Sequence, residues 1–169
     1  EGDCTKLSEI YLRNMTSIYL MCGKKILLLY RIGSRVVKDS YTGTAGGHFE
    51  AFELNNPKAC ALRELFEETG LTEENIYDMS LRYITLRRKG NEIRQNYYYF
   101  ANIDSEIEIS SNEGNPEWVD FDKLLDLEMP HSSKAVIKHY FEIGKDTNSL
   151  YCGIADKNGV YFKALEDFI

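Results

Sequence analysis

The sequence predicts an α+β fold in which a mixed β-sheet lies between helices. Three observations support this prediction. Apolar runs of strand length occur in pairs, two segments have helical spacing with start and stop signals, and the order along the chain is strands, helix, strands, helix. The chain has 169 residues, of which 43% are hydrophobic and 28% charged, so one domain with a sizeable core is expected.

The first part of the chain is expected to form a lead-in and two strands. Residues 1–13 are polar and mixed, so we interpret them as an N-terminal tail. Residues 16–22 and 25–31 are rich in apolar side chains, and Gly23 lies in the turn between them. The second run is apolar through its centre, which favours a strand buried on both faces. Residues 35–45 then form a loop or extended segment.

The next segment has the signals of an α-helix. Pro57 suits the first helical turn, because the N–H that proline lacks would be unpaired there, and Asn55 or Asn56 can cap that start. Gly70 suits the C-terminal end. One helical face carries Leu62, Leu65, Phe66 and Thr69, and another carries Glu64, Glu67 and Glu68.

The three glutamates point to a cation site. Like charges at this spacing destabilise a helix by about 0.2–0.5 kcal/mol per pair. A hard divalent cation would remove that repulsion, because Mg²⁺ is bound by carboxylate oxygens together with substrate phosphates. A solvated acidic surface is the alternative interpretation of the same residues.

The second half of the chain is expected to add strands on either side of a second helix. A connector over residues 71–78 can contain one extra helical turn. The following elements are strands at 81–88 and 93–103, a short strand at 117–119, a brief helix at 121–126, a helix from Pro130 to about Ile143, and a hairpin at 149–164.

Charge and cysteine usage exclude several classes of protein. The net charge of −7 argues against binding to nucleic-acid polymers or anionic membranes, which need a basic surface. No apolar run approaches 18 residues, so no membrane span is expected. Cys4, Cys22, Cys60 and Cys152 form no Cys-x-x-Cys pair, which favours reduced thiols in a cytoplasmic protein over disulfides or a zinc site.

Residues 47–71 resemble the signature of the Nudix hydrolase family. That signature is Gly, five residues, Glu, seven residues, then Arg-Glu-apolar-any-Glu-Glu-any-Gly-apolar. The matching residues are Gly47, Glu53, Arg63, Glu64, Leu65, Glu67, Glu68, Gly70 and Leu71. Nine residues rather than seven separate Glu53 from Arg63, and we expect the extra pair in the loop before the helix, where insertions cost little.

The resemblance implies a fold and a chemistry. The fold would be the Nudix-type α/β/α sandwich over residues 14–146, with a small C-terminal β-hairpin extension over 147–169 packed on it. The chemistry would be hydrolysis of a phosphoanhydride bond in a nucleoside diphosphate derivative with Mg²⁺ or Mn²⁺. The resemblance also assigns roles to single residues. The metal ligands would be Glu64, Glu67, Glu68 and the backbone carbonyl of Gly46, while Arg63 would hold a carboxylate of the signature in place and Glu53 would orient the loop.

A fourth carboxylate lies outside this signature. Residues 113–118 resemble the mobile loop of mutator-type 8-oxo-dGTP diphosphatases, in which a Glu binds metal or acts as base. Glu113 matches that Glu best and Glu117 is the second choice. The identity of the base varies within the family, so both Glu67 and Glu113 remain candidates.

The resemblance favours a (d)NTP or an oxidised (d)NTP such as 8-oxo-dGTP as the small-molecule substrate, giving nucleoside monophosphate and pyrophosphate. ADP-ribose, dinucleoside polyphosphates and nucleotide sugars stay open as alternatives. Isopentenyl diphosphate isomerase and a non-catalytic nucleotide-binding module are distant alternatives, because Cys60 is poorly placed for the former and all signature glutamates are present. Arg31, Arg35 and Asn96 are candidate substrate contacts. The protein would be a monomer or a homodimer.

Overall fold

The computed structural model describes residues 9–32 and 39–168 of the chain. Its strands are β1 (Tyr11–Cys22), β2 (Lys25–Arg31), β3 (Ser40–Thr42), β4 (Tyr77–Lys89), β5 (Glu92–Asn102), β6 (Asn115–Asp120), β7 (Leu150–Asp156) and β8 (Gly159–Leu165). The α-helices are α1 (Pro57–Thr69) and α2 (His131–Glu142), and short 3₁₀ turns are η1 (Ala51–Glu53), η2 (Glu73–Asn75), η3 (Phe121–Asp126) and η4 (Gly144–Asp146). Neither α-helix is long and apolar enough to cross a membrane.

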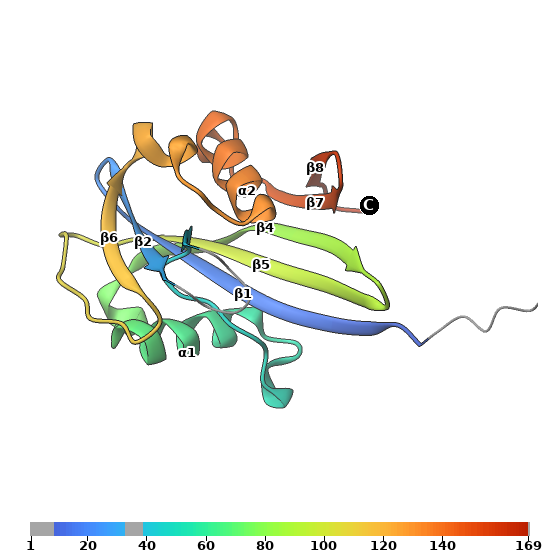
Figure 1. The fold of residues 1–169 in the computed structure, drawn as a ribbon, viewed down its shortest axis with the longest axis horizontal. Coiled ribbons are helices and arrows are strands. Elements are labelled where there is room, and N and C mark those ends of the chain that lie inside the picture. Colours follow the sequence, from blue (N-terminus) through green and yellow to red (C-terminus); the bar gives the residue numbers. More distant parts are fainter. Residues whose placement is uncertain (1–8, 33–38, 169) are drawn as a thin grey trace, which may run out of the picture.

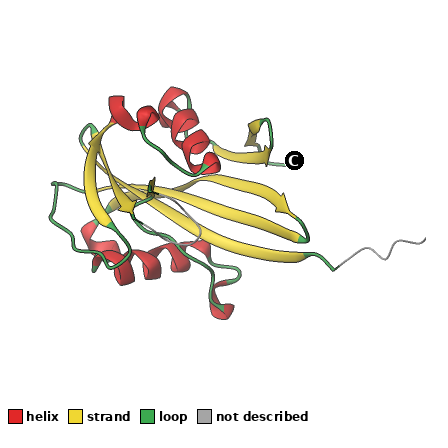
Figure 2. Ribbon diagram, viewed as in Figure 1, coloured by secondary structure: helices red, strands yellow, loops and turns green. Residues whose placement is uncertain are grey.

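One mixed sheet organises the described residues. Its strands follow the order β3-β2-β1-β5-β4-β7-β8, and β6 pairs with β2. The β1–β5 and β4–β7 pairs are parallel, whereas the other pairs are antiparallel. Helix α1 covers one face of the sheet and α2 covers the other (Figures 1 and 2). The predicted α+β fold, a mixed sheet between helices, is confirmed.

Side chains of β1 alternate between the two helical layers, as the period of a strand requires. Ile18 and Leu20 pack in the apolar cluster beneath α1, which includes Leu65. Tyr19 and Met21 pack in the cluster on the α2 side. The same chain segment therefore builds both halves of the core, and its α1 side lies directly behind the acidic helix.

The strands are longer than the sequence pattern indicated. β1 begins at Tyr11 rather than at residue 16, so part of the expected tail is sheet. Tyr11 and Leu12 are mostly exposed. Their backbone nevertheless continues the parallel ladder with β5, where Tyr11 lies opposite Glu92. Because backbone pairing rather than side-chain burial forms this end of the strand, no apolar pattern announced it.

Helix α1 has the predicted ends but a different buried face. Asn56 Oδ1 accepts a hydrogen bond from the Ala59 N–H (3.1 Å), and Gly70 ends the helix at a left-handed φ of 74°. The buried residues are Cys60, Ala61 and Leu65, while Phe66 is 58% exposed. The expectation that Phe66 faces the core is therefore wrong, because the small Cys60 and Ala61 let the helix approach the sheet on the neighbouring face.

The C-terminal hairpin extends the sheet. β7 pairs with β4 in parallel and β8 closes that edge. Arg82 of β4 fixes the loop that leads into the hairpin, because its Nη2 donates to the carbonyls of Gly144 and Thr147, both at 2.7 Å. The hairpin therefore belongs to the same layer as the rest of the sheet.

Candidate active site

A glycine-containing loop runs between β1 and α1. Its backbone follows β1, with hydrogen bonds from the Thr16 N–H to the Gly47 carbonyl (2.9 Å) and from the Ile18 N–H to the Ala45 carbonyl (2.8 Å). A Cβ added at Gly46 would lie 2.3 Å from the Thr16 carbonyl oxygen, and one at Gly47 would lie 2.2 Å from Glu64 Oε1. Only glycines allow the loop this close to both the strand and the helix.

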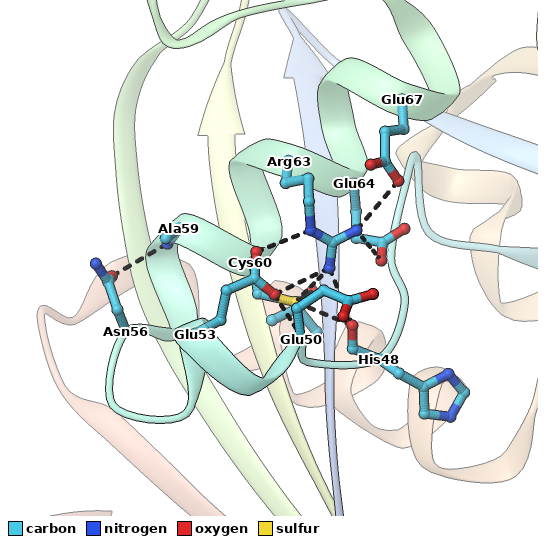
Figure 3. Close-up of polar contacts among 10 residues, drawn as sticks. His48, Glu50, Glu53, Asn56, Ala59, Cys60, Arg63, Glu64 and Glu67 are labelled. Carbon is cyan, nitrogen blue, oxygen red and sulfur yellow. Dashed lines mark hydrogen bonds and ion pairs between the residues drawn. The ribbon is translucent and has the colours of Figure 1, made fainter.

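Arg63 is the centre of the polar network on α1 (Figure 3). Its Nε and Nη2 donate to the two oxygens of Glu53, at 2.8 and 2.9 Å. Its Nη1 donates to Glu64 Oε1 at 2.8 Å and to Glu67 Oε2 at 3.1 Å. Its Nη2 also donates to the carbonyl oxygen of His48 at 3.0 Å. Every nitrogen of the guanidinium is therefore engaged, and one arginine joins the loop to two of the three helical glutamates.

Glu53 is the buried partner in this network. It is 1% exposed and also accepts a hydrogen bond from the Glu50 N–H at 2.9 Å. The hydrogen bonds from Arg63 lower the pKa of Glu53 to about 2, although burial opposes that change. The arrangement fits the orienting roles expected for Glu53 and Arg63.

A second arginine faces the remaining carboxylates. Nη2 of Arg31, at the end of β2, lies 3.1 Å from Glu113 Oε2 and 3.8 Å from Glu68 Oε1. Gly114 makes this approach possible, because a Cβ there would lie 2.6 Å from the Tyr30 carbonyl oxygen and 3.3 Å from Arg31 Cγ. The loop that carries Glu113 thus comes to the end of α1.

Glu68 is the most perturbed acid of the site. Its side chain is 8% exposed, and its Oε2 is buried without a hydrogen-bond partner. Burial raises its pKa to about 7, while Arg31 and the backbone of Gly46 lower it and the charges of Glu113 and Glu64 raise it further. Burial also raises the pKa of Glu64. Desolvated carboxylates that repel one another are stabilised when a cation arrives.

The other sequence candidates lie away from this cluster. Asn96 is on the α2 side of the sheet, where it donates to Ser17 Oγ (3.2 Å) and its Oδ1 is buried without a partner. Glu117 accepts a hydrogen bond from the Tyr41 hydroxyl (2.8 Å) instead of facing Glu68. Arg35 lies outside the described residues. The imidazole of His48 points away from Arg63 (Figure 3) and contacts Arg13.

The donor set suits a hard divalent cation. Within residues 9–32 and 39–168, no three acidic, His or Cys side chains already converge as a metal site. Instead, Arg63 stands between Glu64 and Glu67, and Arg31 stands between Glu68 and Glu113. The unpartnered buried oxygen of Glu68 and the oxygen-only ligands nevertheless fit Mg²⁺ or Mn²⁺. Sequence reasoning found these carboxylates but missed Gly114, whose only signal was its place beside Glu113.

Comparison with known proteins agrees with this geometry. The NUDIX domain matches residues 12–140. A putative hydrolase, 111R, from Invertebrate iridescent virus 3 is 32% identical over 124 residues, covering 69% of this chain and 64% of that relative. The chain thus spans less than two thirds of the length of this relative.

Solved structures share the fold at low sequence identity. A MutT protein from Bacillus halodurans superposes with a TM-score of 0.62 at 22% identity, covering 90% of this chain and 97% of that one. A C. elegans Ap4A hydrolase superposes with a TM-score of 0.61 at 14% identity, covering 80% and 99%. With the domain match spanning most of the chain, the protein belongs to the Nudix hydrolase family.

Proposed function

We propose that this protein hydrolyses a phosphoanhydride bond in a nucleoside diphosphate derivative with Mg²⁺ or Mn²⁺. The observation that carries the proposal is Glu68, a buried carboxylate with an unpartnered oxygen at the point where α1, the glycine loop and the Glu113 loop meet. Family membership supports the class of chemistry.

The metal would be held by oxygen ligands from three segments. Glu64, Glu67 and Glu68 come from α1, the carbonyl of Gly46 comes from the glycine loop, and Glu113 comes from the loop before β6. When bound, the cation supplies charge neutralisation at the phosphate oxygens and lowers the pKa of bound water. Arg63 keeps Glu64 oriented because Glu53 anchors its guanidinium from behind.

The chain's own residues also handle the proton of the attacking water. The water oxygen forms a bond to phosphorus, the anhydride oxygen leaves with its electron pair, and a carboxylate takes the proton. Glu67 and Glu113 suit that step because their side chains are 55% and 52% exposed and can reach solvent. Glu68 is less suited, because it is enclosed.

For the substrate, we propose a (d)NTP or oxidised (d)NTP such as 8-oxo-dGTP. The Glu113 loop supports this choice, as does the likeness to the MutT fold. The equally similar Ap4A hydrolase fold keeps dinucleoside polyphosphates, ADP-ribose and nucleotide sugars as alternatives. Arg31 would contact phosphates, whereas Asn96 would meet only a part of the substrate that reaches the α2 side of the sheet. Cys22, Cys60 and Cys152 are free thiols, in keeping with the proposed cytoplasmic location.

A substrate panel with Mg²⁺ tests the proposal, with nucleoside triphosphates, oxidised nucleotides, ADP-ribose, Ap4A and nucleotide sugars as arms. The matched variants are Glu67→Gln in the site and Glu74→Gln on the exposed η2 turn. We expect Glu67→Gln to lose about 100-fold or more in turnover, and Glu74→Gln to keep wild-type turnover. Full turnover by Glu67→Gln would overturn the metal site, and pyrophosphate release from no substrate would overturn the function.

A further inference from the structure

We propose that Arg31 is an internal counter-ion, which holds Glu68 and Glu113 together without metal and which a divalent cation displaces from them. The proposal rests on the proposed function, because it assumes that Glu68 is a metal ligand. It goes beyond that function by making metal binding a competition between two cations for the same oxygens.

The first observation is the position of the guanidinium. Its Nη2 lies within ion-pair distance of both carboxylates, at 3.1 Å from Glu113 and 3.8 Å from Glu68. These two acids come from segments far apart in the chain, and Arg31 is the described cation that contacts both. The guanidinium thus occupies the space between two expected metal ligands.

The second observation is that this contact is incomplete. Arg31 Nε and Glu68 Oε2 are both buried, and neither has a hydrogen-bond partner. The 3.8 Å separation from Glu68 is too long for a hydrogen bond. A buried donor and a buried acceptor left unpaired on facing groups are unfavourable. The pairing is therefore easily replaced by a partner that satisfies Glu68 better.

Charge gives the direction of the exchange. A divalent ion bound to Glu68 would lie only a few ångströms from the Arg31 guanidinium, and two cations at that distance repel each other. The side chain of Arg31 is 26% exposed, so a path toward solvent is open to it. Once displaced, it is free to meet the phosphates of a substrate. Metal binding would thus release a phosphate-binding group.

The test measures metal affinity without nucleotide. The free Mn²⁺ signal in electron paramagnetic resonance gives the Kd of the wild type and of Arg31→Gln, Arg31→Lys and Arg87→Gln at pH 8.5. Arg87 is an exposed residue of β4, and its variant makes the same change in net charge. We expect Arg31→Gln to bind Mn²⁺ about tenfold more tightly, because a unit charge about 6 Å from a divalent ion in water changes affinity by that factor. Arg31→Lys and Arg87→Gln should stay within about twofold of the wild type.

A second measurement keeps the inference testable if Arg31→Gln does not fold. In ¹⁵N-labelled wild type, saturation with diamagnetic Mg²⁺ should shift the Nε–H resonance of Arg31 and leave that of Arg63 in place. Unchanged or weaker Mn²⁺ binding by folded Arg31→Gln, or an Arg31 resonance that does not move, would overturn the inference and leave the proposed function standing. Absence of any Mn²⁺ binding that Glu67→Gln weakens would overturn the proposed function instead.

Discussion

Replacing Glu53 by glutamine removes the buried charge that anchors Arg63 while keeping the size of the side chain. The fall in the pKa of Glu53 from 4.5 to about 2 corresponds to about 3.4 kcal/mol at 1.36 kcal/mol per pKa unit. Arg63 is 22% exposed, and solvent screening at that side lowers the value. We therefore expect Glu53→Gln to reduce the free energy of unfolding by about 2–3 kcal/mol at pH 7.

The pH dependence of this loss identifies its origin. The pKa of Glu53 is depressed in the folded protein, so its contribution is fully present above about pH 5 and is lost as the pH falls from the unfolded value of 4.5 toward 2. Urea unfolding followed by circular dichroism at pH 7, 5 and 4 measures the difference between wild type and variant. The gap should narrow by about 0.5–1 kcal/mol at pH 4. A gap that is below 0.5 kcal/mol at pH 7, or that is the same at all three pH values, would refute the reasoning.

Three further perturbations follow from the same geometry. Gly47→Ala places a Cβ 2.2 Å from Glu64 Oε1, so the carboxylate must move; we expect a stability loss of about 1–3 kcal/mol in urea and about tenfold weaker Mn²⁺ binding. Arg82→Gln removes two charged hydrogen bonds of 2.7 Å and should cost about 2–4 kcal/mol in urea unfolding, with unchanged Mn²⁺ affinity. Mn²⁺ binding should tighten as the pH rises through about 7, because Glu68 must lose its proton; calorimetry in two buffers should show proton release at pH 6 and little at pH 8.5.

The local parts of the fold could be predicted from the sequence. The Asn56 cap, Pro57 and Gly70 marked both ends of α1, because capping depends on residues within one turn. The start of β1 could not be predicted, since Tyr11 is held there by pairing with β5 and not by burial. The exposure of Phe66 depends on which face of α1 meets the sheet, and helical spacing alone leaves two neighbouring faces open.

The candidate site divides in the same way. The signature placed Glu53, Arg63 and Glu64 in one network, because a short loop and a single helix carry all three. The meeting of Arg31 with Glu113 could not be predicted, since it needs β2 and the loop before β6 to end at the same place in the sheet. Long-range pairing of this kind leaves no periodic signal in either segment.

The two arginines of the site differ in how firmly they are held, and that difference sets their responses to a cation. Arg63 donates from all three nitrogens and is anchored by the buried Glu53, so displacing it would leave a charge unpaired in the interior. Arg31 has an unpartnered Nε, a long contact to Glu68 and a half-exposed partner in Glu113. An arriving divalent ion therefore loses least by displacing Arg31 and keeping Arg63. The structure thus assigns one arginine to hold the ligands and the other to yield them.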